Sequence, residues 1–194
     1  MSEEKSKYPQ ISDIENELKR ERYRQRYKVS LKNTVFSLVT VAAIAVLVAT
    51  LWLPVLQIYG GSMSPTLEDG QIVVSTTVNK LESGDIIAFY YNNKVLVKRV
   101  IAGAGQWVNI DADGNVFIND AYLNEPYLGK KALGNTDIEY PYQVPEGKIF
   151  VMGDEREVSI DSRTSTVGCI DREQIIGKIV FRVWPMDKFG AVGR

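Results

Sequence analysis

Residues 34–53 read TVFSLVTVAAIAVLVATLWL, and this apolar stretch decides how the chain is organised. From residue 33 to residue 67 there is no Asp, Glu, Lys or Arg. In a helix these 20 residues span about 30 Å, the thickness of the hydrocarbon core of a bilayer. A core helix normally carries a polar stripe, whereas this stretch offers only four hydroxyl side chains, at residues 34, 37, 40 and 50. We therefore predict one membrane-spanning helix over residues 34–53.

The flanks of this stretch predict its orientation. Seven Lys or Arg residues but only one acid, Glu21, lie within residues 19–33, and the other flank is uncharged up to residue 67. By the positive-inside rule the N-terminus is cytoplasmic. Because some 33 residues precede it, the stretch is typical of an uncleaved signal anchor. We expect a cytoplasmic basic segment (1–33), the transmembrane helix (34–53) and an extracytoplasmic domain (54–194).

The composition excludes several classes of site. The chain has 194 residues, 45% of them hydrophobic, and 23 basic against 24 acidic side chains, a balance that does not suggest a nucleic-acid partner. It contains no histidine, which rules out a Ser-His-Asp triad, a Cys-His pair and a histidine-ligated zinc site. Its one cysteine, Cys169, cannot form an intrachain disulfide or a thiolate cluster. Acid–base chemistry must therefore use Lys, Asp, Glu or Tyr.

The remainder of the chain, residues 54–194, has the pattern of an all-β domain. Short runs rich in Val, Ile, Phe and Tyr are separated by turn residues such as Asn92-Asn93, a pair typical of a type I′ hairpin. Residues 120–145 contain three prolines and no clean period, so we expect an irregular insertion there. The fold class is mainly β: one transmembrane helix followed by an all-β, sandwich-like or partly barrel-like domain. The predicted strands cover residues 71–76, 85–91, 95–101, 106–110, 115–118, 148–152 and 175–183.

A glycine-rich turn holds the first candidate for chemistry. Residues 60–67 read GGSMSPTL and follow the predicted span closely. Two glycines before Ser62 allow a tight turn that exposes the hydroxyl and aims the Ser62 N–H at a substrate carbonyl. Ser64 is a rival nucleophile in the same turn. An ordinary linker turn is the alternative interpretation of the segment.

Two adjacent cations, Lys98 and Arg99, interrupt an apolar strand. Strand alternation puts them on opposite faces, each between apolar residues, so one of them must meet apolar surroundings. Burial lowers the pKa of a lysine, and a neutral lysine can act as a general base. A snorkelling or salt-bridged lysine is the alternative interpretation.

Acids and arginines alternate after the predicted strand 148–152. Residues 152–163 read MGDEREVSIDSR. Such a pattern can form a fixed network of ion pairs and hydrogen bonds. A solvated, charged loop is the alternative interpretation.

Taken together, these segments resemble the bacterial type I signal peptidases, which are serine proteases with a Ser/Lys dyad, in their compact Gram-positive form. Residues 61–67 match the family pattern G-S-M-x-P-T-L, and residues 84–89 match its G-D strand start. Residues 97–101 match V-K-R-V-I, and residues 152–163 match M-G-D-N-R-x-x-S-x-D-S-R. The four motifs occur in the family's order, within residues 34–185.

The resemblance implies roles for individual residues. Ser62 would be the nucleophile, with its own N–H in the oxyanion hole, and Lys98 the general base. Some family members have a serine where this chain has Gly60, so a second oxyanion donor is not identified. Ser159 matches a serine that hydrogen-bonds the lysine, and Asp161 and Arg163 match a supporting pair. The supporting residues implied are Ser159, Asp161, Arg163, Gly153 and Asp154.

The resemblance also implies a function. The chain would be a single-pass cell-membrane serine endopeptidase that removes signal peptides from secreted preproteins, cutting after small residues of the A-x-A type. Its partners would be preproteins and membrane lipid, with no nucleic acid, metal or cofactor, and we expect a monomer. Two alternatives stay open: an inactive membrane-anchored β-domain that binds a partner, and another Ser-Lys protease that cleaves itself.

Overall fold

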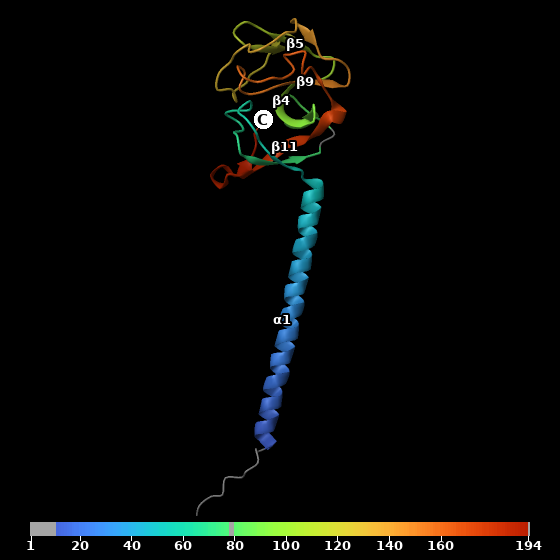
Figure 1. Ribbon diagram of the computed structural model, residues 1–194, viewed down its shortest axis with the longest axis vertical. Helices are drawn as coiled ribbons and strands as arrows, with labels where there is room; N and C mark the ends of the chain where they lie inside the picture. The colour runs from blue at the N-terminus through green and yellow to red at the C-terminus, as the bar shows by residue number, and fades with distance from the viewer. Residues whose placement is uncertain (1–10, 78–79, 194) are drawn as a thin grey trace, which may run out of the picture. The chain divides into compact units, whose positions relative to one another are not determined.

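The computed structural model describes residues 11–77 and 80–193 of the chain. It divides into two compact units, Met1–Ala49 and Thr50–Arg194. The first contains most of one helix, α1 (Ile11–Trp52), which is 42 residues long (Figure 1). The predicted span and much of the basic segment before it are thus one continuous helix. Within this helix, Ile14–Leu47 is long and apolar enough to cross a membrane.

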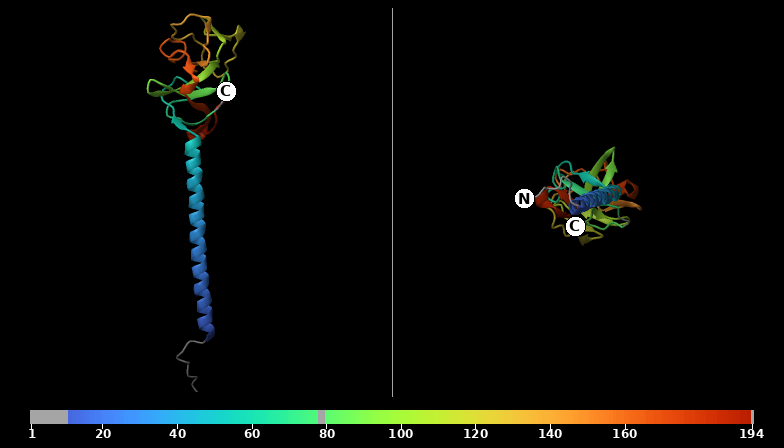
Figure 2. Two further views of the ribbon diagram at one scale, coloured as in Figure 1. Left: turned by 90° about the vertical axis from the view of Figure 1, so that its right-hand side faces the viewer. Right: turned by 90° about the horizontal axis from the view of Figure 1, so that it is seen from below.

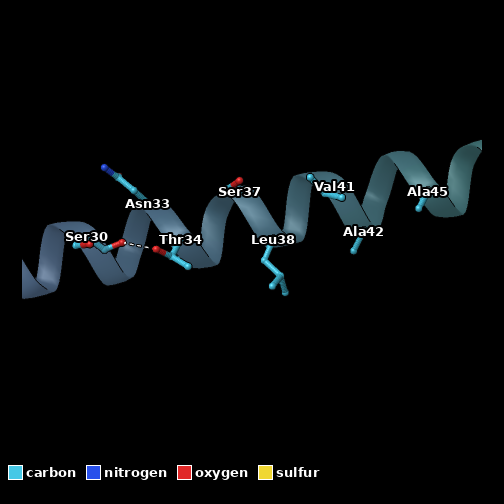
Figure 3. Close-up of a pocket in the computed structure, with 8 residues that line it drawn as sticks. All are labelled: Ser30, Asn33, Thr34, Ser37, Leu38, Val41, Ala42 and Ala45. Carbon is cyan, nitrogen blue, oxygen red and sulfur yellow. Dashed lines mark hydrogen bonds between the residues drawn. The ribbon is translucent and has the colours of Figure 1, made fainter.

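One face of α1 carries small and hydroxyl-bearing residues (Figure 3). The hydroxyl of Thr34 donates a hydrogen bond to the carbonyl of Ser30 at 2.9 Å, and Thr40 donates to Phe36 at the same distance. These bonds lower the cost of placing a hydroxyl in lipid, because each donor is satisfied within its own helix. The face comprises Ser30, Asn33, Thr34, Ser37, Leu38, Val41, Ala42 and Ala45.

The second unit is built from antiparallel sheets, which confirms the mainly β fold class. In the described residues, one sheet has eight strands in the order β1-β2-β11-β3-β4-β9-β10, with β12 paired to β11. The other has four, in the order β7-β6-β5-β8. Figure 1 shows β5 and β11 at opposite ends of the body, with β4 and β9 between them, and the left view of Figure 2 shows the same order. The strands of the large sheet are β1 (Val55–Gln57), β2 (Ile72–Thr76), β3 (Ile86–Tyr91), β4 (Lys94–Ala102), β9 (Lys148–Met152), β10 (Ile170–Asp171), β11 (Ile175–Trp184) and β12 (Gly190–Ala191), and those of the small sheet are β5 (Trp107–Ile110), β6 (Val116–Ile118), β7 (Ala121–Tyr122) and β8 (Tyr142–Gln143).

All seven predicted strands are present, with bounds within a residue or two. Asn92 and Asn93 have φ values of 43° and 64°, as the type I′ turn between β3 and β4 requires. The expected insertion, residues 120–145, contains the two-residue strands β7 and β8 and is otherwise irregular. The sequence pattern missed β1, β7, β8, β10 and β12, which are two or three residues long.

Strand β3 lies at the centre of the packing because both of its faces are apolar. Ile86 and Ala88 join one buried cluster with Met63 of the serine turn, whereas Ile87 and Phe89 join another with residues of β4, β9 and β10. A third cluster fills the space around β5, β6 and the ends of β4 and β9. Alternation along one strand thus connects the serine turn to the strands that carry the other candidate residues.

The register of β4 brings the distant sequence motifs together. Lys98 pairs with Ile87 of β3, and its neighbour Arg99 pairs with Met152 at the end of β9. Met152 is followed directly by Gly153 and Asp154. The lysine motif and the last motif therefore lie on adjacent strands.

Candidate active site

The central contact of the candidate site joins Lys98 to Ser62. Lys98 Nζ donates a hydrogen bond to Ser62 Oγ at 2.7 Å. Lys98 is only 3% exposed, and Ser62 lies at the wall of an open cleft. The two residues are 36 positions apart in the sequence. A nucleophile next to a base within hydrogen-bond distance is the arrangement that nucleophilic catalysis needs.

The serine turn is fixed by residues on either side of Ser62. Met63 and Leu67 are buried in the core, and Leu67 N–H donates to the Met63 carbonyl at 2.9 Å. The Ser62 carbonyl accepts a hydrogen bond of 3.1 Å from the Glu155 N–H. Gly60 has a φ of 80°, a conformation that strains residues with a Cβ atom, so this backbone favours glycine there. Within the described part of the chain Lys98 Nζ hydrogen-bonds Ser62 and not Ser64, the rival in the same turn.

Burial lowers the pKa of Lys98 from 10.5 to about 8. The nearby positive charge of Arg163 also lowers it, whereas the carboxylates of Asp161 and Asp154 raise it. Loss of solvation is the largest effect, because a buried ammonium gives up water that a hydroxyl partner only partly replaces. A substantial fraction of Lys98 is therefore neutral near pH 8.

Asp161 and Arg163 form a buried ion pair that holds the last motif in place. Arg163 Nε and NH2 donate to the two carboxylate oxygens of Asp161, each at 2.8 Å. Asp161 Oδ2 also accepts the Gly153 N–H at 2.9 Å and the Ser159 hydroxyl at 2.7 Å. Among the described residues, Ser159 thus hydrogen-bonds Asp161 and not Lys98, the partner that the resemblance implied. A carboxylate is the stronger acceptor for a hydroxyl.

Arg99 is buried as well as Lys98, but its guanidinium is paired with a carboxylate. Its exposure is 0%, and it donates to Asp154 through Nε at 2.8 Å and NH2 at 2.6 Å. Thr66, in the serine motif, donates to the same carboxylate at 2.5 Å. Asp154 therefore ties the serine turn, β4 and the last motif together.

Three residues that sequence reasoning did not assign belong to the same buried region. Arg156 donates to Glu125 at 2.5 Å through NH2, and both side chains are fully buried. The Tyr127 ring lies 3.7 Å from the guanidinium carbon of Arg99. Glu125 and Tyr127 belong to the insertion, where no hydrophobic period marks the buried positions. Of the three residues, only Arg156 gave a signal in the sequence, as one member of the alternating run of acids and arginines in residues 152–163.

An open cleft of about 660 Å³ borders Ser62. It is lined by residues 55–60, 62, 63 and 94–97. Ile58 and Met63 line the cleft while remaining buried, at 4% and 1% exposure, so they serve both the core and the cleft wall. The described residues contain no cluster of three or more His, Cys, Asp or Glu side chains able to hold a metal ion.

Comparison with known proteins identifies the family. A sequence model of the family described as signal peptidase, peptidase S26, matches residues 31–184. Signal peptidase IB of Staphylococcus aureus is 38% identical over 152 residues, which cover 68% of this chain and 78% of that protein. Thylakoidal processing peptidase 1 of Arabidopsis thaliana is 35% identical over 144 residues, covering 66% of this chain and 41% of that protein.

A crystal structure of a signal peptidase I from Enterococcus faecalis is 29% identical, with a TM-score of 0.46 over 53% of this chain and 98% of that chain. The family assignment comes from the sequence matches, which cover most of the chain. The chain belongs to the signal peptidase family, peptidase S26, whose members are serine endopeptidases that remove signal peptides.

Proposed function

We propose that this peptidase cleaves preproteins with a Ser/Lys dyad in which Ser62 is the nucleophile and Lys98 the general base. The observation that carries the proposal is the hydrogen bond of 2.7 Å between Lys98 Nζ and Ser62 Oγ. Burial, which lowers the pKa of Lys98 to about 8, supports the role of a base at physiological pH. With no histidine in the chain, lysine is the group in contact with the nucleophile that can take up its proton.

The reaction follows from this pair. Neutral Lys98 accepts the proton of the Ser62 hydroxyl as Oγ attacks the carbonyl carbon of the scissile peptide bond. The resulting ammonium then protonates the leaving amine, and an acyl-enzyme remains on Ser62. Lys98, neutral again, activates a water molecule that hydrolyses the ester and restores the hydroxyl.

The backbone of Ser62 supplies the donor for the oxyanion. Within residues 11–77 and 80–193 the Ser62 N–H has no hydrogen-bond acceptor. The neighbouring N–H of Gly60 is already used, because it donates to Asp69 Oδ1 at 2.7 Å. An unpaired N–H on the nucleophile itself is aimed at the place where negative charge develops.

The cleft suits an extended peptide. Within the described residues β1 is an edge strand of the large sheet, and β4 pairs with β9 only from Arg99 onward, so residues 94–98 have a free edge. A peptide that lies between these two edges can form main-chain hydrogen bonds to both strands. The aliphatic walls at Leu56, Ile58 and Leu96 favour small apolar side chains beside Ser62. This arrangement supports cleavage after small residues of the A-x-A type.

The position of the apolar helix in the sequence supports a membrane-tethered substrate. Eight residues, 54–61, separate residue 53 from Ser62, so the distance between the two is at most about 30 Å when the chain is extended. The basic residues before the span favour a cytoplasmic N-terminus and an extracytoplasmic catalytic domain. The nucleophile would then lie near the outer surface of the membrane, where the signal segment of a translocated preprotein ends.

The test is cleavage of a signal-bearing preprotein by the full chain in detergent or liposomes. Ser62→Ala and Lys98→Ala are each expected to lower the rate by about a thousandfold or more, because each removes a group that reacts. Ser64→Ala is the matched control and should keep wild-type activity, since this serine lies in the same turn without contacting Lys98. Substantial activity in either of the first two variants would refute the dyad.

The same assay separates the alternatives. Replacing the small residue before the cleaved bond of the preprotein by Leu is expected to block cleavage. A self-cleaving protease would instead shorten its own chain, which mass spectrometry of the wild-type and Ser62→Ala proteins would detect. An inactive binding domain would bind the preprotein and leave it intact.

A further inference from the structure

The insertion contributes two side chains to the buried region beside the Ser62–Lys98 pair. Glu125 is only 5% exposed, although it belongs to a segment without regular structure. Tyr127, two residues later, is partly buried and donates its hydroxyl hydrogen to Glu125 Oε1 at 2.8 Å. Neither residue lines the cleft. Their burial in an otherwise irregular segment requires a reason beyond loop packing.

Glu125 is connected to the serine turn through one arginine. Its carboxylate accepts hydrogen bonds from Arg156 NH2 at 2.5 Å and NH1 at 3.3 Å. The third donor of the same guanidinium, Nε, bonds the carbonyl of Gly153 at 3.0 Å. The guanidinium is planar and rigid, so the position of Glu125 determines where Gly153 is held.

Gly153 in turn touches both the nucleophile's backbone and the groups around Lys98. A Cβ atom at this position would overlap the carbonyl oxygen of Ser62 and the hydroxyl of Ser159. The Gly153 N–H donates to Asp161, whose charge acts on Lys98. A shift of the Gly153 backbone would therefore move Ser62 or open the space around the lysine.

Tyr127 lies on the side of Lys98, the other member of the Ser62–Lys98 pair, because it contacts the next residue, Arg99. Its ring packs on the Arg99 guanidinium at 3.7 Å, and Arg99 directly follows Lys98 on β4. Burial, together with the negative charge of Glu125, raises the pKa of Tyr127 far above its usual value. The phenol therefore remains protonated and keeps donating to Glu125. One short segment thus supports both sides of the site, β4 through Arg99 and the turn after β9 through Arg156.

We propose that Glu125 and Tyr127 are positioning residues, which hold Gly153 and Arg99 so that Ser62 Oγ and Lys98 Nζ stay within hydrogen-bond distance and Lys98 stays buried. This inference rests on the proposed dyad and adds to it a role for the insertion. Neither residue touches the substrate. Their effect is on the geometry and the solvation of the reacting pair.

The test measures kcat, KM and the pH profile of preprotein cleavage by the full chain in detergent. Glu125→Gln keeps the shape of the side chain but removes the charge opposite Arg156, and Tyr127→Phe keeps the ring on Arg99 but removes the hydroxyl. We expect Glu125→Gln to lower kcat by about ten- to a hundredfold with KM within about twofold, because small displacements of reacting groups are costly. Tyr127→Phe should lower kcat by about threefold, because it removes only one supporting hydrogen bond.

The pH profile distinguishes positioning from loss of folded protein. A smaller folded fraction lowers the rate equally at every pH, whereas water reaching Lys98 raises its pKa toward that of a free lysine. The groups that face Lys98 and contribute to its titration are Asp161, Asp154 and Arg163. We expect the midpoint of kcat/KM to move up by about half a pH unit or more in Glu125→Gln, and by less in Tyr127→Phe.

Asp137→Asn is the matched control, since Asp137 belongs to the same insertion but bonds the exposed Ser165. It should leave both kcat and the midpoint unchanged. The inference is overturned if every variant that folds, Tyr127→Phe included, keeps the wild-type midpoint. If Ser62→Ala is inactive while Glu125 and Tyr127 variants behave as wild type, only this inference fails. If Ser62→Ala retains activity, the dyad itself fails.

Discussion

Lys98 and Arg99 are neighbours on β4 and both are buried, yet their surroundings differ in one respect. Arg99 shares two hydrogen bonds with the carboxylate of Asp154, whereas Lys98 bonds the neutral hydroxyl of Ser62. Burial penalises both charges. In Arg99 the carboxylate of Asp154 compensates for the lost solvation. In Lys98 the compensation is incomplete, so the pKa falls to about 8 and the group becomes a base.

The same contrast between a paired and an unpaired charge extends to the region around Lys98 and Arg99. Three arginine–carboxylate pairs with fully buried side chains surround the lysine, and their hydrogen bonds fix the backbone of the serine turn and the last motif. Among the described residues Lys98 forms no ion pair, and the carboxylates of Asp161 and Asp154 act on it only through their charge. The paired charges therefore provide rigidity, whereas Lys98 has the role of the base in the proposed dyad. The pairs are Arg99–Asp154, Arg156–Glu125 and Arg163–Asp161.

The largest effect is expected where a paired charge loses its partner. Arg99→Met should lower the free energy of unfolding by about 3–5 kcal/mol, because the buried carboxylate of Asp154 is left without its cation. Thermal or urea unfolding of the full chain in detergent measures this. Combining Arg99→Met with Asp154→Leu should recover much of the loss, since both charges are then gone. A single Arg99→Met variant as stable as the wild type would contradict the view that this pair is a structural unit.

Substitution of the neighbouring Lys98 should change the free energy of unfolding in the opposite direction. Lys98→Met removes a buried charge that no carboxylate contacts, and a pKa lowered from 10.5 to about 8 corresponds to about 3 kcal/mol of destabilisation. The variant should be more stable than the wild type by up to this amount below pH 8. The advantage should fade as the pH rises from 8 toward 10.5, because there the folded protein has released a proton that the unfolded chain still holds. A variant that is less stable than the wild type at pH 7 would mean that Lys98 is a compensated charge like Arg99.

The pH profile of activity also tests the contrast between Lys98 and Arg99, with a smaller expected effect. Below pH 8, kcat/KM should rise about tenfold per pH unit, because only neutral Lys98 accepts the Ser62 proton. Above this pKa the rate should level off. A rate that still climbs steeply near pH 10 would show that Lys98 is not neutralised. The pH dependence of wild-type stability, measured in parallel, excludes unfolding as the cause of any change.

The sequence could predict the parts of the fold that repeat a pattern. The seven predicted strands follow from alternation and turn residues, and six of them have four residues or more. The five missed strands, β1 among them, have only two or three residues and show no period of their own. They form because neighbouring strands supply their hydrogen-bond partners, which is a property of the folded chain.

The candidate site was predictable only in part, for a similar reason. Motif spacing led to Ser62 and Lys98, but the burial of Arg99 depends on a carboxylate 55 residues away. Glu125 and Tyr127 lie in the insertion, whose sequence has no clean period, and their burial results from contacts with Arg156 and Arg99, which are distant in the sequence. The hydroxyl of Ser159 bonds Asp161 because this carboxylate is next to it in the folded loop. Contacts between distant charges leave no local signal.

The most direct test of the account is the titration of Lys98 itself in the folded protein. Lysine labelled with carbon-13 at Cε allows this by NMR on the full chain in detergent, with Lys98→Arg to assign the signal. The contrast with Arg99 predicts a midpoint of about 8 for Lys98, the value set by burial beside a hydroxyl. A midpoint near 10.5, that of an ordinary lysine, would contradict it and leave Ser62 without a base.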